Sequence, residues 1–306
     1  MLKGLINLNT LGFFYSAMAA VCMAIAPAFL KKGLEKMTRL EMVTSRTIFF
    51  VAAAAALSLS EGRSLAFPDR AWLVAFMLLL TLTGNIMGDV SYFRAIQLIG
   101  MSRGITIASS YPIIVTLVST LWMGEPLTLP VVTAPLLIVG GLALLRREPG
   151  GSVRAEQPSN PAGFLWALVA AFGWGSMMLM QKWLITEKLI QPVTVTLWRS
   201  YSLFIICWTY WISSSLWRGL NPAAIFRMGR AAWSWSAAAA VSGLGFSGFF
   251  FTKAMELLPV SVVTPISASS PLLTAAIGVF FMREKLSAPQ WGGLLLILGG
   301  VLAVSA

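Results

Sequence analysis

The chain has 306 residues, of which 58% are hydrophobic and only 11% are charged. A soluble domain carries roughly 25% charged residues, so this composition excludes a water-soluble globular protein. The formal net charge of +11 comes from basic residues at the ends of apolar blocks, which indicates loops facing anionic membrane lipid and argues against nucleic acid as a partner.

Ten apolar segments follow one another along the chain, and most match the roughly 20 helical residues that cross a bilayer. Lipid offers backbone polar groups no solvent, so we expect each segment to be an α-helix. The predicted spans are 9–30, 40–60, 70–92, 103–123, 129–147, 161–183, 193–215, 231–252, 261–282 and 287–306. We expect the first span to be retained and not cleaved, because Pro27 follows its Ala-x-Ala site and lysines end the run. The sequence thus predicts an all-α, multi-pass membrane protein.

The loop 147–163 collects Pro, Gly, Ser and charged residues, as a linker between two halves does. We place the first half at 1–148, the linker at 149–160 and the second half at 161–306. Sliding 92–147 onto 251–306 gives 15 identities in 56 positions without a gap. Each half holds five predicted spans, an odd number, so the second copy must enter the membrane from the opposite face. This arrangement is an inverted-topology repeat, an architecture of secondary transporters.

Two stretches of the second half carry a family resemblance. In 171–204, the motif Trp-Gly-Ser is followed by an arginine in the next helix, and 251–304 contains the series Pro, Ser, Pro, Glu-x-Leu and Gly-Gly. With these motifs the chain resembles the drug/metabolite transporter superfamily, in its branch with two EamA domains. The first half departs from the pattern at 20–28, where AVCMAIAPA replaces the Trp-Gly-Ser turn.

The resemblance covers nearly the whole chain and implies a ten-helix carrier in the plasma membrane, the inner membrane of a bacterium. It implies export of an amino acid or another small metabolite. Small multidrug antiporters of this superfamily depend on a glutamate in the first helix. No acid lies between Gly12 and Lys31 here, so lipophilic-cation antiport is not expected. The resemblance implies cytoplasmic termini, whereas counting Lys and Arg on alternate loops places both termini outside, and both orientations stay open.

The sequence contains no histidine, which removes His-based triads, His metal sites and imidazole proton relays. GMSRG at 100–104 therefore lacks the base of a serine hydrolase, and GLGFSG at 243–248 lies in an apolar block where small residues favour helix packing. Cys22 and Cys207 are expected to be buried as small hydrophobic residues. We expect no enzyme, cofactor or metal. The alternatives to a carrier are a channel, a non-transporting subunit and, less favoured, a lipid-modifying enzyme.

Pro112 and Pro271 occupy equivalent positions inside the fourth and ninth spans, where each removes a backbone hydrogen bond one turn back. One interpretation is an opened helix whose freed carbonyl and nearby hydroxyls face substrate. The other is a packing kink satisfied by the same hydroxyls. The hydroxyls belong to Ser109, Ser110, Ser269 and Ser270.

Arg46 and Arg199 are also equivalent in the repeat, and each lies about 9 Å into its helix at 1.5 Å per residue. Either these side chains extend to lipid headgroups, or they provide a fixed positive charge that orients a carboxylate or closes a gate.

Asp89 is the acid that falls within a predicted span, and an ionisable residue inside a membrane is a functional candidate by default. It could carry a coupling proton or pair with Arg46 or Arg94, although a position at the membrane interface is equally open. Asn85 and Tyr92 join it in the most polar helix surface of the first half.

The remaining candidates are aromatic and acidic. Tyr111, Trp174 and Trp198 could line an apolar cavity for a small-molecule substrate, or anchor helices at the membrane interface. Glu125 and Glu284 fall at span ends, where we expect them to cap loops or to form gate pairs.

Overall fold

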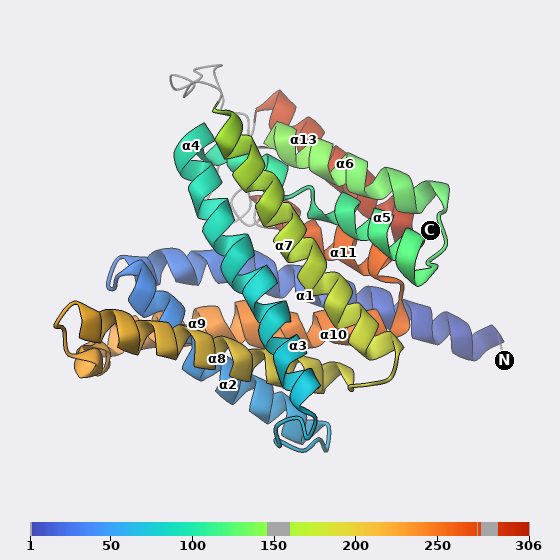
Figure 1. Cartoon of the computed structure of the whole chain (residues 1–306). Helices are drawn as coiled ribbons and strands as arrows, with labels where there is room; N and C mark the ends of the chain where they lie inside the picture. Colours follow the sequence, from blue (N-terminus) through green and yellow to red (C-terminus); the bar gives the residue numbers. More distant parts are fainter. Residues whose placement is uncertain (1, 146–159, 274, 277–286, 306) are drawn as a thin grey trace.

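The computed structural model describes residues 2–145, 160–273, 275–276 and 287–305, and the regular structure of these ranges is helical (Figure 1). The first half contains α1 (Leu2–Leu34), α2 (Arg39–Ser60), α3 (Ala71–Thr81), η1 (Leu82–Gly88), α4 (Asp89–Ala108), α5 (Tyr111–Met123) and α6 (Leu129–Leu145). The second half contains α7 (Pro161–Thr186), α8 (Pro192–Trp217), η2 (Pro222–Arg227), α9 (Arg230–Ala240), η3 (Val241–Phe246), α10 (Ser247–Leu257), α11 (Val260–Ala268) and α13 (Ala288–Ser305).

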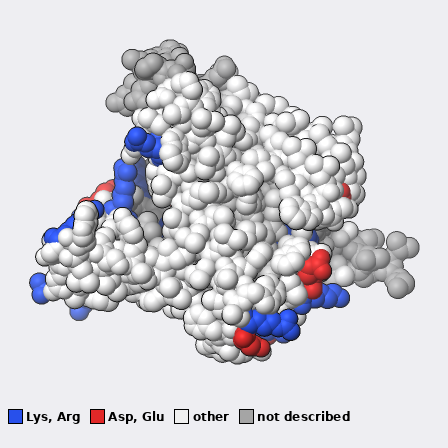
Figure 2. All heavy atoms as spheres, viewed as in Figure 1, with Lys and Arg blue, Asp and Glu red and all other residues white. Residues whose placement is uncertain are grey.

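Six helices in the described ranges are long and apolar enough to cross a membrane. They are Leu8–Leu34, Arg39–Ser60, Ala71–Gly100, Thr106–Met123, Pro161–Thr186 and Ala288–Ser305. Figure 2 shows a surface that is largely free of charged side chains, with Lys, Arg, Asp and Glu gathered toward its edges. These features support the predicted multi-pass membrane protein, while the number of ten crossings stays a prediction.

The predicted spans 70–92 and 103–123 differ from the observed helices Ala71–Gly100 and Thr106–Met123 chiefly at the end of the first. The helix that begins at Ala71 continues to Gly100, where a φ of 81° ends it in a conformation that glycine adopts without strain. The rest of α4 ends at Ala108 and a new helix, α5, begins at Tyr111. Pro112 lies in the first turn of α5, where a missing N–H costs no hydrogen bond. The proline therefore marks a helix break, as predicted.

The last helices of the two halves, α6 and α13, pack against each other in opposite directions. The Gln290 amide near the start of α13 donates to the Leu145 carbonyl at the end of α6, at 3.2 Å. Gly141 and Gly300 occupy equivalent positions, and each lies so close to the opposite helix that a Cβ would meet a backbone carbonyl. Close approach of this kind through small residues is how helices associate in lipid.

The second helices of the halves, α2 and α8, also pack together with their directions opposed. The indole of Trp198 and the hydroxyl of Tyr201, both in the first part of α8, donate to the carbonyls of Ala66 and Leu65 in the loop that follows α2, each at 2.9 Å. The Trp198 side chain is thus bound to a surface loop. The pairs α4 with α7 and α1 with α10 are further contacts between the halves, and α4 and α7 run side by side in Figure 1.

π-Helical segments interrupt the third helix in both halves, one segment in each half. They are η1 and η3, and Leu82 and Val241, where they begin, are 159 positions apart, the same spacing that aligns the repeat. π-Helical turns occur frequently at functional sites because they displace side chains from the regular helical register. Both segments contribute residues to the cavity described next.

Candidate functional site

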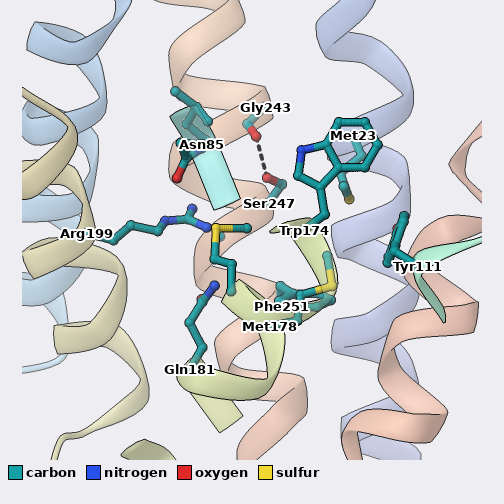
Figure 3. Close-up of a pocket in the computed structure, with 13 residues that line it drawn as sticks. Met23, Asn85, Tyr111, Trp174, Met178, Gln181, Arg199, Gly243, Ser247 and Phe251 are labelled. Atoms are coloured by element: carbon teal, nitrogen blue, oxygen red, sulfur yellow. Dashed lines mark hydrogen bonds between the residues drawn. The ribbon is translucent and has the colours of Figure 1, made fainter. Parts of the chain in front are cut away.

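A cavity of about 260 Å³ lies where the two halves meet (Figure 3). Helix α7 contributes most of one wall, and the two π-helical segments, α8 and α10 contribute much of the rest. The described residues that line it are Met23, Asn85, Tyr111, Trp174, Met177, Met178, Gln181, Arg199, Gly243, Leu244, Ser247, Gly248 and Phe251. Four of the residues predicted from sequence are among them, namely Asn85, Tyr111, Trp174 and Arg199.

Trp174 is held in a fixed position on this wall. Its indole Nε1 donates to the Asp89 carboxylate at 3.0 Å. Its ring lies 5.2 Å from the ring of Tyr92 and 6.1 Å from that of Tyr111, the latter in an edge-to-face arrangement. A pre-oriented aromatic face of this kind can accept an apolar ligand at little cost in side-chain entropy.

Asp89 lies next to the cavity and is connected to it through Trp174. Because its helix continues to Gly100, Asp89 lies inside the helix and is half-buried, and its position relative to the membrane interface stays a prediction. Arg46 is close enough to attract the carboxylate electrostatically. Arg94 instead donates to the Gln97 side chain at 3.1 Å, so it does not take the predicted role of partner to Asp89.

Arg199 is buried with only 8% of its surface exposed, and Figure 3 shows it extending from α8 into the group of cavity residues. Its guanidinium lies over the Phe50 ring at 5.3 Å from the centroid, a cation–π arrangement. Its Nε has no hydrogen-bond partner among the described residues. The side chain therefore does not extend to a lipid headgroup, and of the two sequence interpretations the fixed charge in the interior fits the geometry.

The serines near the two prolines do not line the cavity. The hydroxyls of Ser110 and Ser269 donate to the carbonyls of Ile107 and Ile266, at 2.7 and 2.6 Å. These equivalent bonds satisfy carbonyls at the ends of α4 and α11. The geometry at Ser110 and Ser269 is that of a helix break satisfied by its own hydroxyls, and a substrate role for Ser109, Ser110, Ser269 and Ser270 stays a prediction.

Several cavity residues were not predicted from the sequence. Gln181 is only 1% exposed, and neither atom of its amide finds a partner among the described residues. Ser247 donates to the Gly243 carbonyl at 2.6 Å and faces the same space. The repeat could have located part of this set, since Leu244 is equivalent to Asn85. Gln181 and the methionines gave no such signal, because single residues of these types in an apolar helix usually indicate packing.

Glu125 and Lys182, which we call the latch, both bind backbone groups around the junction of α10 and α11. The Glu125 carboxylate accepts from the backbone N–H groups of Val260 and Ser261, at 2.7 and 3.0 Å, and so caps the start of α11. The Lys182 ammonium donates to the carbonyls of Met255 and Leu258, at 2.6 and 2.9 Å, where α10 ends. Glu125 and Lys182 also attract each other. Glu125 thus contacts the second half, while Glu284 lies outside the described residues.

Comparison with known proteins now identifies the family. The model of the EamA-like transporter family matches residues 10–147 and again 161–306. The chain belongs to this family. An uncharacterized transporter of Archaeoglobus fulgidus is 24% identical over 287 residues, covering 94% of this chain and 95% of the relative.

Shorter matches include an uncharacterized transporter of Bacillus subtilis, YwfM, which is 38% identical over 58 residues, 19% of this chain and 20% of the relative. A solved structure titled "Crystal structure of protein" superposes with a TM-score of 0.74 and 17% identity, covering 95% of both chains. At that identity the likeness shows the fold alone. The family match and the relative from Archaeoglobus fulgidus support a membrane transporter.

Proposed function

We propose that this EamA-family protein is a secondary transporter that moves a small, partly apolar metabolite, an amino acid or a similar compound, outward across the plasma membrane by alternating access. The observation that carries the proposal is a cavity between the two halves of an EamA-family chain, lined by Trp174, Gln181 and Arg199. Lys31 is the repeat counterpart of Lys182, yet it is exposed. A site between two repeats is what a carrier needs in order to face each side of the membrane in turn.

The two halves are proposed to be inverted repeats of five helices each. Equivalent helices pack in opposite directions, as α6 does with α13. Equivalent contacts also recur between the halves: Gly12 lies against Leu258, and its counterpart Gly163 lies against Ile99, the counterpart of Leu258. Both observations are expected of two copies related by a two-fold axis in the membrane plane. Rocking of one half against the other would then open the two ends in turn.

Asp89 is the proposed carrier of a coupling proton. Its side chain is half-buried and accepts a hydrogen bond from Trp174 in the cavity wall. The positive charge of Arg46 attracts its carboxylate. Ionisable groups in such positions mark proton relays in many transporters.

Counterflow in proteoliposomes tests the proposal. Vesicles with the purified protein are loaded with a mixture of unlabelled amino acids and small organic acids, and the uptake of each labelled compound is measured. We expect saturable uptake of at least one compound that is accelerated by the internal pool. Uptake that rises linearly and ignores the internal pool would indicate a channel, and no uptake of any compound would favour a non-transporting subunit.

A further inference from the structure

The two halves differ in the charged residues beside the cavity. In the first half, Arg46 is accompanied by Asp89. In the second half, Arg199 is the counterpart of Arg46, but the counterpart of Asp89 is Gly248. The repeat has therefore kept the cation in both copies and the anion in only one.

Gly248 packs directly against Arg199, since a Cβ at this glycine would lie 2.8 Å from the Nη2 of the guanidinium, and the glycine supplies no counter-charge there. No acidic side chain of the described residues forms an ion pair with Arg199. The ring of Phe50 compensates only part of the cost of burying this charge. A buried, fixed guanidinium that opens onto a cavity is thus left without a counter-ion supplied by the described chain.

The surroundings of Arg199 define what the counter-ion would be attached to. The unpartnered amide of Gln181 and the unpartnered Oδ1 of Asn85 face the same cavity. The remaining wall is apolar and aromatic, with Trp174, Tyr111 and Phe251 as its largest members, and no acid occurs among the described residues that line it. The site can hold one anionic group and an apolar body, and it offers no carboxylate to a cationic group.

We propose that Arg199 binds the carboxylate of the cargo, which is a small carboxylic acid anion with an apolar body lying against Trp174. The guanidinium donates two hydrogen bonds to the carboxylate in a fork geometry, and the missing side chain at Gly248 lets the guanidinium lie against α10 beside the cavity. The inference rests on the proposed transport function only in taking the bound anion to be the transported compound, and the binding site itself does not depend on transport.

Four probes that share a phenylethyl body and differ in charge test the site: 3-phenylpropionate, L-phenylalanine, 3-phenylpropionamide and 2-phenylethylammonium. Affinities are measured by calorimetry on the full chain in nanodiscs. We expect the two carboxylates to bind at least about tenfold more tightly than the neutral amide and the cation, as charge-assisted hydrogen bonds require. Equal affinity for carboxylate and amide, or preference for the cation, would overturn the proposal.

Two variants remove the site in independent ways. Arg199→Gln removes the charge, and Gly248→Asp supplies the acid that the first half has, which neutralises the arginine in place. Both are expected to lower the affinity for 3-phenylpropionate by about tenfold or more, whereas Arg199→Lys retains part of it. Arg218→Gln, an exposed change at the end of the same helix, serves as the control. Undiminished carboxylate binding by folded Gly248→Asp protein contradicts the proposal even if Arg199→Gln fails to fold.

The counterflow assay separates this inference from the proposed function. Carboxylate binding that depends on Arg199 without saturable flux leaves the anion site standing and removes the transporter. Saturable flux of neutral or cationic compounds with no preference for carboxylates leaves the transporter standing and removes the anion site.

Discussion

Equivalent lysines of the two halves lie in different surroundings. Lys182 donates to two carbonyls at the end of α10 and is attracted by Glu125, whereas its counterpart Lys31 is exposed. The lysine of the second half is therefore bound to backbone carbonyls, and the equivalent lysine of the first half is exposed. This difference is what we expect if the proposed carrier has two states and the structure represents one of them.

A second difference concerns the interior. The contacts that hold the halves together are repeated almost residue for residue, as with Gly141 and Gly300, but the charges beside the cavity are not, because Gly248 stands where the first half has Asp89. The scaffold has kept the symmetry of the repeat, and the site has lost it. Variants of the scaffold and of the site, made where possible at equivalent positions of the two halves, test this contrast.

The largest effect is expected at the interface of α6 and α13. Gly141→Ala and Gly300→Ala each place a Cβ against a backbone carbonyl of the opposite helix, which cannot move independently. We expect each to lower the free energy of unfolding by about 1–3 kcal/mol, measured by thermal unfolding in detergent. The neighbouring Gly140→Ala and Gly299→Ala meet open space and are the controls. Unequal effects at 141 and 300 would break the symmetry of the scaffold.

Removing the latch is expected to shift the population of the closed end. Lys182→Met eliminates two charge-assisted hydrogen bonds, and such bonds contribute about 1.5–3 kcal/mol each. Spin labels at the exposed positions Glu187 and Glu256 should report a broader or longer distance distribution by pulsed electron resonance. Lys31→Met, the matched change in the other half, should leave this distribution as it is. A closed end that persists in Lys182→Met would remove the latch from the mechanism.

Asp89→Asn tests proton coupling with little change in shape. The asparagine Oδ1 can still accept from the Trp174 indole, but the side chain can neither bind nor release a proton near neutral pH. We expect flux driven by a pH gradient to fall to the level seen without a gradient, while counterflow at constant pH persists. Asp69→Asn, in an exposed loop, is the control. An unchanged pH dependence would exclude Asp89 as the proton carrier.

Trp174→Phe should have the smallest effect. It removes one hydrogen bond to Asp89 and keeps an aromatic ring against Tyr92 and Tyr111. The net value of one such bond, about 0.5–1.5 kcal/mol, corresponds to a roughly two- to tenfold loss in affinity for a cavity ligand. The change Trp198→Phe also removes an indole hydrogen bond, but from a surface loop, and should not alter ligand affinity.

Much of the fold could be predicted because lipid imposes a length and an apolar composition on each helix. The break before Pro112 followed from the missing N–H. The end of the third helix at Gly100 did not, since a glycine inside a polar stretch gives no sign that it will adopt a positive φ. In the cavity, Arg199 and Trp174 could be predicted because a charged side chain inside a membrane helix is costly and an aromatic ring can line an apolar cavity. Gln181 could not, because its meaning depends on which face of α7 meets the other half.

The central claim is that two copies of one five-helix unit sit in the membrane in opposite directions, and cysteine labelling tests it most directly. Cys22 and Cys207 are first replaced by Ala. Single cysteines are then introduced at two exposed positions that follow equivalent helices, Ser64 after α2 and Arg218 after α8. A membrane-impermeant maleimide added to intact cells should label one of these cysteines and leave the other unlabelled until the membrane is opened. Labelling of both from the same side would contradict the account.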